Sequence, residues 1–155
     1  MNDTHYSGNP ALDGILRDTA LSFQRFLDAL RELAGDASQN ILDLYAKSGE
    51  VAVSQKSDAS PVTDADHASH RLICESLISL TPAIPVLSEE STLEQLIGRR
   101  DWPCCWMIDP LDGTREFLEG TGEFTVNIAL IVDAVAVLGL IAAPNRGYLD
   151  LGVPD

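Results

Sequence analysis

Basic residues are scarce in this chain of 155 amino acids, which has 10 Lys and Arg against 24 Asp and Glu. The formal net charge of −14 at pH 7 argues against nucleic acid as a partner, because an acidic surface repels a phosphate backbone. A phosphate-containing ligand of such a protein needs a cation between its phosphate and the carboxylates. A divalent metal ion held by Asp and Glu would supply that cation.

Cysteine is scarce as well, since the chain holds only three. Cys74, Cys104 and Cys105 provide neither a disulfide framework nor the spacing of a zinc site. Two of them fall in an apolar run and the third on an expected helix, so we expect small buried residues there. Free thiols are typical of a reducing compartment, and we therefore expect a cytoplasmic location.

A signal peptide, a membrane span and a catalytic triad are also missing from the sequence. Residues 1–9 lack the basic and apolar regions of a signal peptide, and no apolar run approaches the length of a membrane span. We expect no transmembrane segment, which leaves only a peripheral association with the inner membrane open. No Ser-His-Asp arrangement is apparent, and His67 and His70 are expected at the surface rather than as zinc ligands.

Hydrophobic residues, in contrast, make up 45% of the chain and recur with the period of a helix in its first half. Their spacing predicts one long helix from about residue 15 to 45, or two helices broken near Gly35. A further helix is expected over 64–80. A short helix is expected at 93–97.

Apolar and β-branched runs predict strands in the rest of the chain. We expect a strand followed by a polar loop over 51–63, a short strand at 84–87 and a buried strand at 104–108. The runs at 124–132 and 135–142 are separated by only two residues, which predicts a hairpin.

This order of elements indicates an α/β fold, more closely an α+β layered sandwich. Paired helices are expected to pack on a largely antiparallel sheet. Residues 1–14 are interpreted as a flexible N-terminal arm, and residues 15–155 as one domain, because the chain is too short for two ordinary domains.

The sequence Asp109-Pro110-Leu111-Asp112-Gly113-Thr114 directly follows the expected strand at 104–108. Pro110 cannot donate to a sheet and fixes φ, so we expect the strand to end there and turn. Gly113 allows the backbone to approach a ligand closely, with the amides of Gly113 and Thr114 directed at an anion. Carboxylates that bind hard cations, beside amides that bind phosphate, indicate metal-assisted phosphate chemistry.

Ordinary explanations also exist for this motif. An Asp-rich turn after a strand is usually only a turn, whereas a calcium loop is excluded because Ile108 and Pro110 would occupy two of its ligand positions. Two further acidic clusters strengthen the functional interpretation: Asp64 and Asp66 at a helix start, and Glu89 with its neighbour after a strand. Each cluster alone could be a helix cap or a solvated loop, but together they predict shared Mg²⁺ ligands and a metal-activated water as nucleophile.

Four segments occur in a fixed order: 56–66 (KSDASPVTDAD), 85–90 (PVLSEE), 106–117 (WMIDPLDGTREF) and 122–131 (GEFTVNIALI). Their sequences and spacing resemble the motifs of the inositol monophosphatase superfamily, and most closely the CysQ-type 3′(2′),5′-bisphosphate nucleotidases. Leu-Ser-Glu-Glu, and the basic residue with Glu-Phe after Asp-Gly-Thr, favour this branch over inositol monophosphatases. The resemblance extends from the first helix to about Tyr148.

The resemblance implies a site with two or three Mg²⁺ ions. Glu89, Asp109 and the carbonyl of Leu111 would bind one ion, and Asp109 with Asp112 a second. Asp66 would reach a third, weaker ion through water, or would help to position the nucleophile.

The resemblance also implies the groups that carry catalysis and bind substrate. Thr114 and Glu89 would orient the attacking water, and the amides of Gly113 and Thr114 would hold the phosphate. The residues that would contact the substrate are Glu89, Leu111, Asp112, Gly113 and Thr114.

Members of this family remove the 3′-phosphate of adenosine 3′,5′-bisphosphate, which gives AMP and phosphate and is linked to sulfate assimilation. They are typically inhibited by Li⁺ and Na⁺. The resemblance thus implies a Mg²⁺-dependent phosphatase with a small nucleotide bisphosphate as its partner, and it gives no oligomeric state. The alternatives are an inactive truncated remnant that binds only metal or a partner, and an inositol monophosphatase.

Family members continue beyond the point where this sequence ends. Their second half carries a Trp-Asp-x-Ala/Gly motif, whose Asp completes the second metal site, and this motif is missing here. The aspartates after Asp112 are Asp133, Asp150 and Asp155, and none of them lies in a Trp-Asp-x-Ala/Gly sequence. We therefore expect only the N-terminal part of the fold, without its C-terminal α/β part, and a weakened second metal site.

Overall fold

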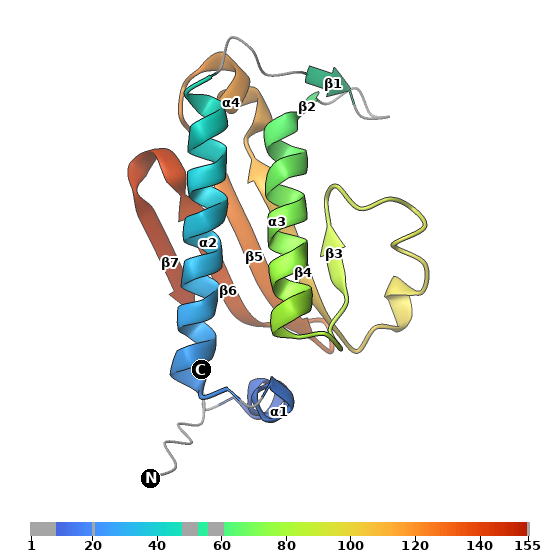
Figure 1. Cartoon of the computed structure of the whole chain (residues 1–155). Helices are drawn as coiled ribbons and strands as arrows, with labels where there is room; N and C mark the ends of the chain where they lie inside the picture. Colours follow the sequence, from blue (N-terminus) through green and yellow to red (C-terminus); the bar gives the residue numbers. More distant parts are fainter. Residues whose placement is uncertain (1–8, 20, 48–52, 56–60, 155) are drawn as a thin grey trace.

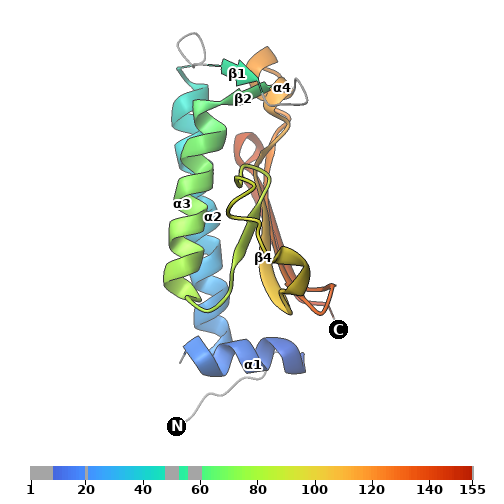
Figure 2. The same ribbon diagram turned by 90° about the vertical axis from the view of Figure 1, so that its right-hand side faces the viewer.

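The computed structural model describes residues 9–19, 21–47, 53–55 and 61–154, in which the long helices lie on one face of a sheet (Figure 1, Figure 2). The helices are α1 (Pro10–Thr19), α2 (Phe23–Tyr45), α3 (Asp64–Leu80) and α4 (Thr114–Glu119), with short 3-10 turns η1 (Arg99–Asp101) and η2 (Pro144–Arg146). The strands are β1 (Val53–Gln55), β2 (Pro61–Thr63), β3 (Val86–Ser88), β4 (Cys104–Asp112), β5 (Thr125–Val132), β6 (Val135–Ala143) and β7 (Tyr148–Gly152).

The main sheet has five strands in the order β3-β4-β5-β6-β7, and β1 pairs with β2 in a separate two-stranded ribbon. Only β3 and β4 are parallel, and the other neighbours are antiparallel. Helices α2 and α3 run side by side in opposite directions over this sheet (Figure 1). The predicted α/β fold, with paired helices on a largely antiparallel sheet, is confirmed.

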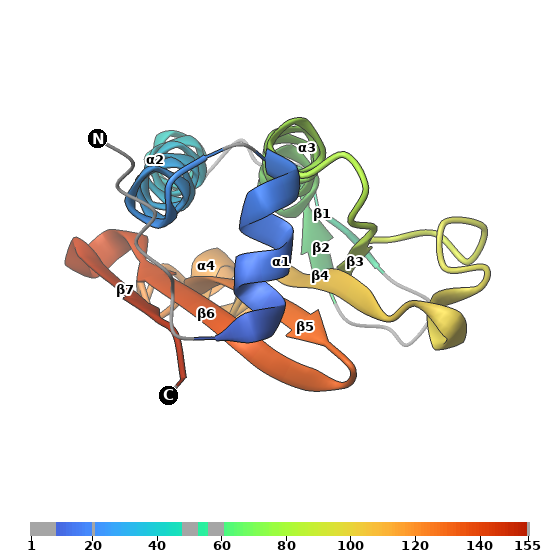
Figure 3. The same ribbon diagram turned by 90° about the horizontal axis from the view of Figure 1, so that it is seen from below.

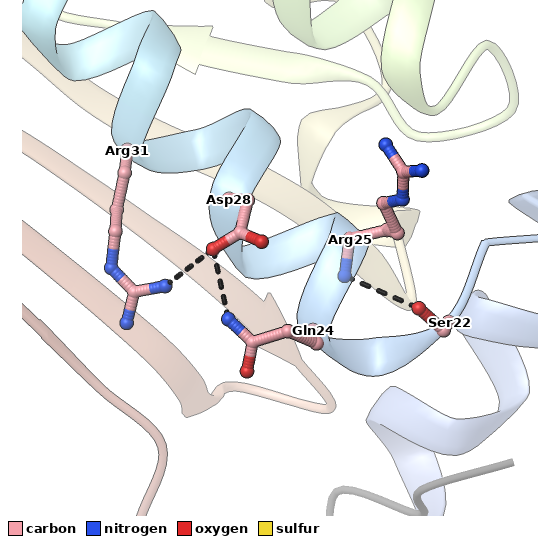
Figure 4. A network of polar contacts seen from close by, with 5 residues as sticks. All are labelled: Ser22, Gln24, Arg25, Asp28 and Arg31. Carbon is pink, nitrogen blue, oxygen red and sulfur yellow. Dashed lines mark hydrogen bonds and ion pairs between the residues drawn. The ribbon is translucent and has the colours of Figure 1, made fainter. Parts of the chain in front are cut away.

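The first long helix is interrupted before Phe23 and not at Gly35. Ser22 is the N-cap of α2, because its hydroxyl accepts a hydrogen bond from the Arg25 amide at 3.3 Å (Figure 4). Asp28 then accepts from the side chains of Gln24 at 2.8 Å and Arg31 at 3.0 Å on the exposed face of the first turns (Figure 4). Of the two alternatives predicted for residues 15–45, the break near Gly35 is wrong, because α2 continues through it and a single glycine costs only about 1 kcal/mol inside a helix.

Helix α1 overturns part of the flexible-arm interpretation. Asn9 begins this helix, since its side-chain oxygen accepts from the amides of Ala11 at 3.1 Å and Leu12 at 3.3 Å. Leu12 and Leu16 are buried, and α1 crosses the lower end of the layer between the helices and the sheet (Figure 3). Residues 10–14 are therefore helical, because burying Leu12 stabilises them. Residues 1–8 of the predicted arm lie outside the described residues.

The segments between the sheet strands differ from the predictions in small ways. Strand β3 is shifted by two residues at its start and by one at its end from the predicted 84–87, and residues 93–97 form turns rather than a helix. The hairpin between β5 and β6 is confirmed. Its two turn residues, Asp133 and Ala134, have φ values of 47° and 63°, which is typical of the tight turn that matches strand twist. Of the segment predicted as a strand followed by a polar loop, 51–63, residues 51–52 and 56–60 lie outside the described residues, and Pro61–Thr63 form β2.

The hydrophobic core lies between the helices and one face of the sheet. Trp106 of β4 is fully buried, stacks on Phe26 of α2 with ring centroids 6.3 Å apart, and donates from its indole nitrogen to the Thr81 hydroxyl at 2.8 Å. On the opposite face of the same sheet, Met107 and Ile141 are 46% and 42% exposed. In the described part of the chain, no helix is long and apolar enough to cross a membrane.

Strand β4 does not end at Pro110, as the sequence had suggested, but continues to Asp112. The pairing with β5 is irregular between Asp109 and Asp112, and a proline is tolerated in a sheet at such a bulge. The carbonyl of Pro110 accepts a hydrogen bond at 2.8 Å from the buried hydroxyl of Ser69 on α3. This contact places the end of β4 against the first turns of α3.

Candidate functional site

Glu89 and Asp109 come together because their strands are parallel neighbours. Ser88 pairs with Ile108 in the register of β3 and β4, so the next residue of each strand is an acid. The amide of Glu89 also donates to the carbonyl of Ile108 at 3.1 Å. The parallel register therefore brings two of the predicted acidic clusters to the same end of the sheet.

The charges of Glu89 and Asp112, at the same end of the sheet, act on the carboxyl group of Asp109. Burial, the charge of Glu89, a hydrogen bond with the Glu89 side chain and the charge of Asp112 raise the pKa of Asp109 to about 7. A hydrogen bond between two carboxyl groups requires that one of them is protonated. Carboxylates crowded in this way are the oxygen donors that a hard cation prefers.

Asp112 is held by a residue that sequence reasoning did not single out. The side-chain nitrogen of Asn127 on β5 donates to the Asp112 carboxylate at 3.2 Å and contacts the Thr125 hydroxyl at 3.2 Å. Asn127 pairs with Asp109 across β4 and β5. Its only signal in the sequence was its place in the fourth family-like segment, which carried no assigned role.

Asp66 is buried and hydrogen-bonded on both carboxylate oxygens. One oxygen accepts from the Thr63 amide at 2.7 Å and from the Thr63 hydroxyl at 2.6 Å. The first of these bonds and the bond from the Asp66 amide to the Thr63 hydroxyl at 3.4 Å form the capping box of α3. The other oxygen accepts from the Thr114 hydroxyl at 2.9 Å. The helix start thus holds Thr114 directly, and Asp66 faces a catalytic candidate rather than open solvent.

The peptide of Leu111 connects the two groups of site residues. Its amide donates to the Asp109 carboxylate at 3.3 Å, and its carbonyl lies 3.3 Å from the Thr114 hydroxyl. Because Thr114 has one hydroxyl proton, its shorter contact with Asp66 is the stronger one. Asp109, Leu111, Thr114 and Asp66 are therefore neighbours in one series of polar contacts, in which the Thr114 hydroxyl donates mainly to Asp66.

Gly113 is required at its position by packing as well as by its backbone conformation. Its φ is +95°, and a Cβ atom there would lie 2.7 Å from the carbonyl oxygen of Glu123. Gly113 is the N-cap of α4, and Thr114 is the first residue of that helix. As in any helix, the amides of the first turn have no acceptor within the helix itself.

His70 is not the surface residue that the sequence suggested. It is half-buried, its Nδ1 lies 2.8 Å from the Ser88 hydroxyl, and Cys74 Sγ lies 3.6 Å from the same nitrogen. Burial lowers the pKa of His70, the charge of Glu90 opposes this shift, and the neighbouring cationic groups add to it. His67, three residues earlier, is exposed as expected.

The three cysteines are free and half-buried, so they are less enclosed than predicted. Burial raises the pKa of all three thiols, and that of Cys74 to about 11. They are therefore poor nucleophiles at neutral pH.

The donor set suits Mg²⁺ in chemistry, but the ligands do not converge on one point. Within the described ranges, no three Asp, Glu, His or Cys side chains group closely enough to hold a metal ion. Glu89 and Asp109 are paired, whereas Asp112 is turned toward Asn127. The three acids therefore do not form one ready ligand set within the described residues.

A broad groove of about 760 Å³ lies on the sheet face that the helices leave open. Asp109 and Asn127 line it together with apolar residues of β4, β5 and β6, such as Ile141, and with Val153 near the chain end. The candidate site therefore borders two regions of different character, the packed helix layer and this open face.

A family profile described as "Inositol monophosphatase family" matches residues 23–151. The chain belongs to this family. Curated relatives include the 3′(2′),5′-bisphosphate nucleotidase CysQ of Salmonella typhimurium, which is 47% identical over 118 residues (76% of this chain and 48% of the relative). The protein of the same description from Buchnera aphidicola is 43% identical over 122 residues (79% of this chain and 46% of the relative).

Solved structures of the family have the same fold. CysQ from Bacteroides thetaiotaomicron is 39% identical with a TM-score of 0.62, and covers 84% of this chain and 46% of its own. The suhB protein of Bartonella henselae is 31% identical with a TM-score of 0.74, and covers 82% of this chain and 48% of its own. The chain therefore spans about half the length of the relatives it matches, and the predicted resemblance to CysQ-type proteins is confirmed.

Proposed function

We propose that this chain provides the metal-binding and water-orienting groups of a phosphatase that removes the 3′-phosphate of adenosine 3′,5′-bisphosphate. The observation that carries the proposal is the joining of Glu89, Asp109 and Thr114 at one end of the sheet, in a chain that is 47% identical to a CysQ bisphosphate nucleotidase. The products are AMP and phosphate. A link to sulfate assimilation belongs to the same proposal.

Mg²⁺ is the proposed cofactor, with Li⁺ and Na⁺ as inhibitors. Glu89, Asp109 and the carbonyl of Leu111 would hold one ion, and Asp109 with Asp112 a second, while Asp66 would contribute to a third through water. When bound, Mg²⁺ supplies charge neutralisation for the phosphoryl oxygens and a lowered pKa for the attacking water.

Thr114 is proposed to orient the attacking water as a hydrogen-bond acceptor. The Thr114 hydroxyl donates its hydrogen bond to the Asp66 carboxylate at 2.9 Å. The lone pairs of the Thr114 oxygen are then directed away from Asp66 and can accept a hydrogen bond from the attacking water. Asp66 therefore acts through Thr114. Glu89 would accept the second hydrogen bond of the same water and so help to orient it.

The substrate phosphate is proposed to lie against the amides of Gly113 and Thr114. Both amides lie at the start of α4, where the first N–H groups have no acceptor within the helix and Gly113 brings the chain close to Glu123. The proposed contact set for the substrate is Glu89, Leu111, Asp112, Gly113 and Thr114. The proposed partner is a small nucleotide bisphosphate, and the proposed location is cytoplasmic, because free thiols are typical of a reducing compartment.

The test is phosphate release by the purified 155-residue chain with adenosine 3′,5′-bisphosphate and Mg²⁺. Release that Li⁺ inhibits and that Glu89→Gln abolishes is the expected result. A folded, monodisperse chain that releases no more phosphate than Glu89→Gln would contradict activity of this chain. Faster release from an inositol monophosphate would instead assign the other branch of the family.

A further inference from the structure

Two adjacent residues of α3 contact the two acidic segments of the candidate site. Ser69 donates from its hydroxyl to the Pro110 carbonyl at 2.8 Å, in the segment between Asp109 and Asp112. His70 Nδ1 lies 2.8 Å from the Ser88 hydroxyl, directly before Glu89. One turn of a single helix therefore anchors both segments.

The segment that carries Glu89 is a tight turn built around the Ser88 hydroxyl. The Glu90 amide donates to this hydroxyl at 3.2 Å, and the Ser88 amide donates to the Ser91 hydroxyl at 3.1 Å. The Ser91 amide donates to the Ser88 carbonyl at 3.1 Å. Ser88 and Glu90, the two residues that flank Glu89, are therefore both held by the hydrogen bonds of Ser88.

We propose that His70 is a positioning residue for Glu89. Its Nδ1 fixes the buried Ser88 hydroxyl, this hydroxyl fixes the Glu90 amide, and the backbone on both sides of Glu89 is then held in one conformation. The inference rests on the proposed function only in taking Glu89 as a metal ligand. Groups that orient a metal ligand from behind contribute strongly to metal affinity.

The contacts of the imidazole identify Nδ1 as the atom that matters. Nδ1 lies 2.8 Å from the Ser88 hydroxyl, whereas the weak thiol of Cys74 is 3.6 Å from Nδ1 and 3.9 Å from Nε2. Asn carries its amide close to the Nδ1 position and can donate or accept, so it can replace this contact in either tautomer. Gln carries its amide one carbon farther and matches Nε2 instead.

These atoms define the variants of the test. His70→Ala removes the contact, His70→Asn restores it, and His70→Gln carries a similar amide at the wrong distance. His67→Ala is the matched control, because His67 lies on the same helix and is exposed. Circular dichroism and urea unfolding of each variant establish that it is folded.

Two measurements follow the effect from the turn to the metal. Amide hydrogen exchange at Glu90 needs no ligand, and we expect about tenfold faster exchange in His70→Ala and His70→Gln. Binding of Mn²⁺, a paramagnetic substitute for Mg²⁺, is measured by electron paramagnetic resonance, and we expect about tenfold weaker affinity in the same two variants. His70→Asn and His67→Ala should remain close to the wild type in both measurements.

Unchanged exchange at Glu90 in folded His70→Ala would overturn the inference, and so would His70→Asn that is no better than His70→Gln. If His70→Ala does not fold, the comparison of His70→Asn with His70→Gln decides. A wild-type chain that binds no Mn²⁺ would overturn Glu89 as a ligand, and the inference with it. If Mn²⁺ binding follows the expected pattern but the wild type releases no phosphate, the positioning role of His70 stands and only the proposed activity fails.

Discussion

The two faces of the five-stranded sheet are organised differently (Figure 2). On the helix-covered face, Trp106, Val126 and Leu130 are fully buried under α2 and α3. On the open face, Met107 and Ile141 are 46% and 42% exposed beside the groove that Asp109 lines. Outside the irregularities of β4 and β6, residues alternate between these faces along the strands, so neighbours in the sequence experience opposite environments.

The comparison shows where the candidate site obtains its rigidity. Asp66 and Ser69 are buried, belong to the covered side, and hold Thr114 and the end of β4 through hydrogen bonds of 2.9 and 2.8 Å. Asp112 belongs to the open side, is exposed, and accepts a hydrogen bond from the Asn127 side chain. The covered side therefore fixes the positioning groups, while the open side leaves a metal-ligand candidate able to move.

The largest contrast between the faces is expected at two adjacent residues of β4. Trp106→Ala removes a fully buried indole and leaves the Thr81 hydroxyl without its partner, so we expect a loss of about 4 kcal/mol in the free energy of unfolding. Met107→Ala, on the half-exposed face, should cost less than about 1 kcal/mol. Urea unfolding monitored by circular dichroism measures both.

If Trp106→Ala does not fold, Trp106→Phe retains most of the ring and loses the hydrogen bond to Thr81. It should then cost about 1–2 kcal/mol. Equal losses at Trp106 and Met107 would show that the open face is as tightly packed as the covered one.

The second contrast concerns the carboxylates at the start of α3. Asp66→Ala removes the acceptor of Thr63 and Thr114 in a buried place, and we expect a loss of about 2–3 kcal/mol. Asp64→Ala changes an exposed residue of the same turn and should cost about 0.5 kcal/mol. Thermal unfolding of both variants checks this order, and a loss for Asp64→Ala as large as that for Asp66→Ala would refute the capping role of Asp66.

Much of this site could be predicted because its signals are local. Helix α3 spans the predicted residues 64–80, and the capping box of Thr63 and Asp66, a signal within four residues, accounts for its start. The approach of Glu89 and Asp109 also follows from acids placed directly after two apolar runs. The assignment of these acids to metal ions stays a prediction.

The features that sequence reasoning missed depend on partners far apart in the chain. Pro110 stays within β4 because the bulge and the Ser69 hydroxyl, 41 residues away, support its carbonyl. His70 is half-buried because Ser88, 18 residues away, lies against it. Neither periodicity nor composition reports such contacts, since both describe only neighbours along the chain.

Replacement of two glycines by alanine is expected to change the free energy of unfolding in opposite directions. Gly113→Ala forces a side chain onto a residue with φ of +95° and places its Cβ 2.7 Å from Glu123 O, so we expect a loss of about 2 kcal/mol. Gly35→Ala, inside α2 with no atom within 4 Å of the new Cβ, should instead stabilise by about 1 kcal/mol. Urea midpoints that move in the same direction for both variants would contradict the close approach at Gly113.

The smallest effect is expected on the open side, at Asn127. Asn127→Ala removes the group that holds Asp112 at 3.2 Å, but the Asp112 carboxylate is exposed and water replaces the lost contact. The free energy of unfolding should therefore change by less than about 0.5 kcal/mol, which is several-fold less than the loss expected for Asp66→Ala. Nuclear magnetic resonance of the Asp112 side chain should show more rotamer averaging in this variant, because no other described side chain is recorded in hydrogen-bond contact with that carboxylate. A destabilisation as large as that of Asp66→Ala would mean that the open side is as firmly held as the covered one.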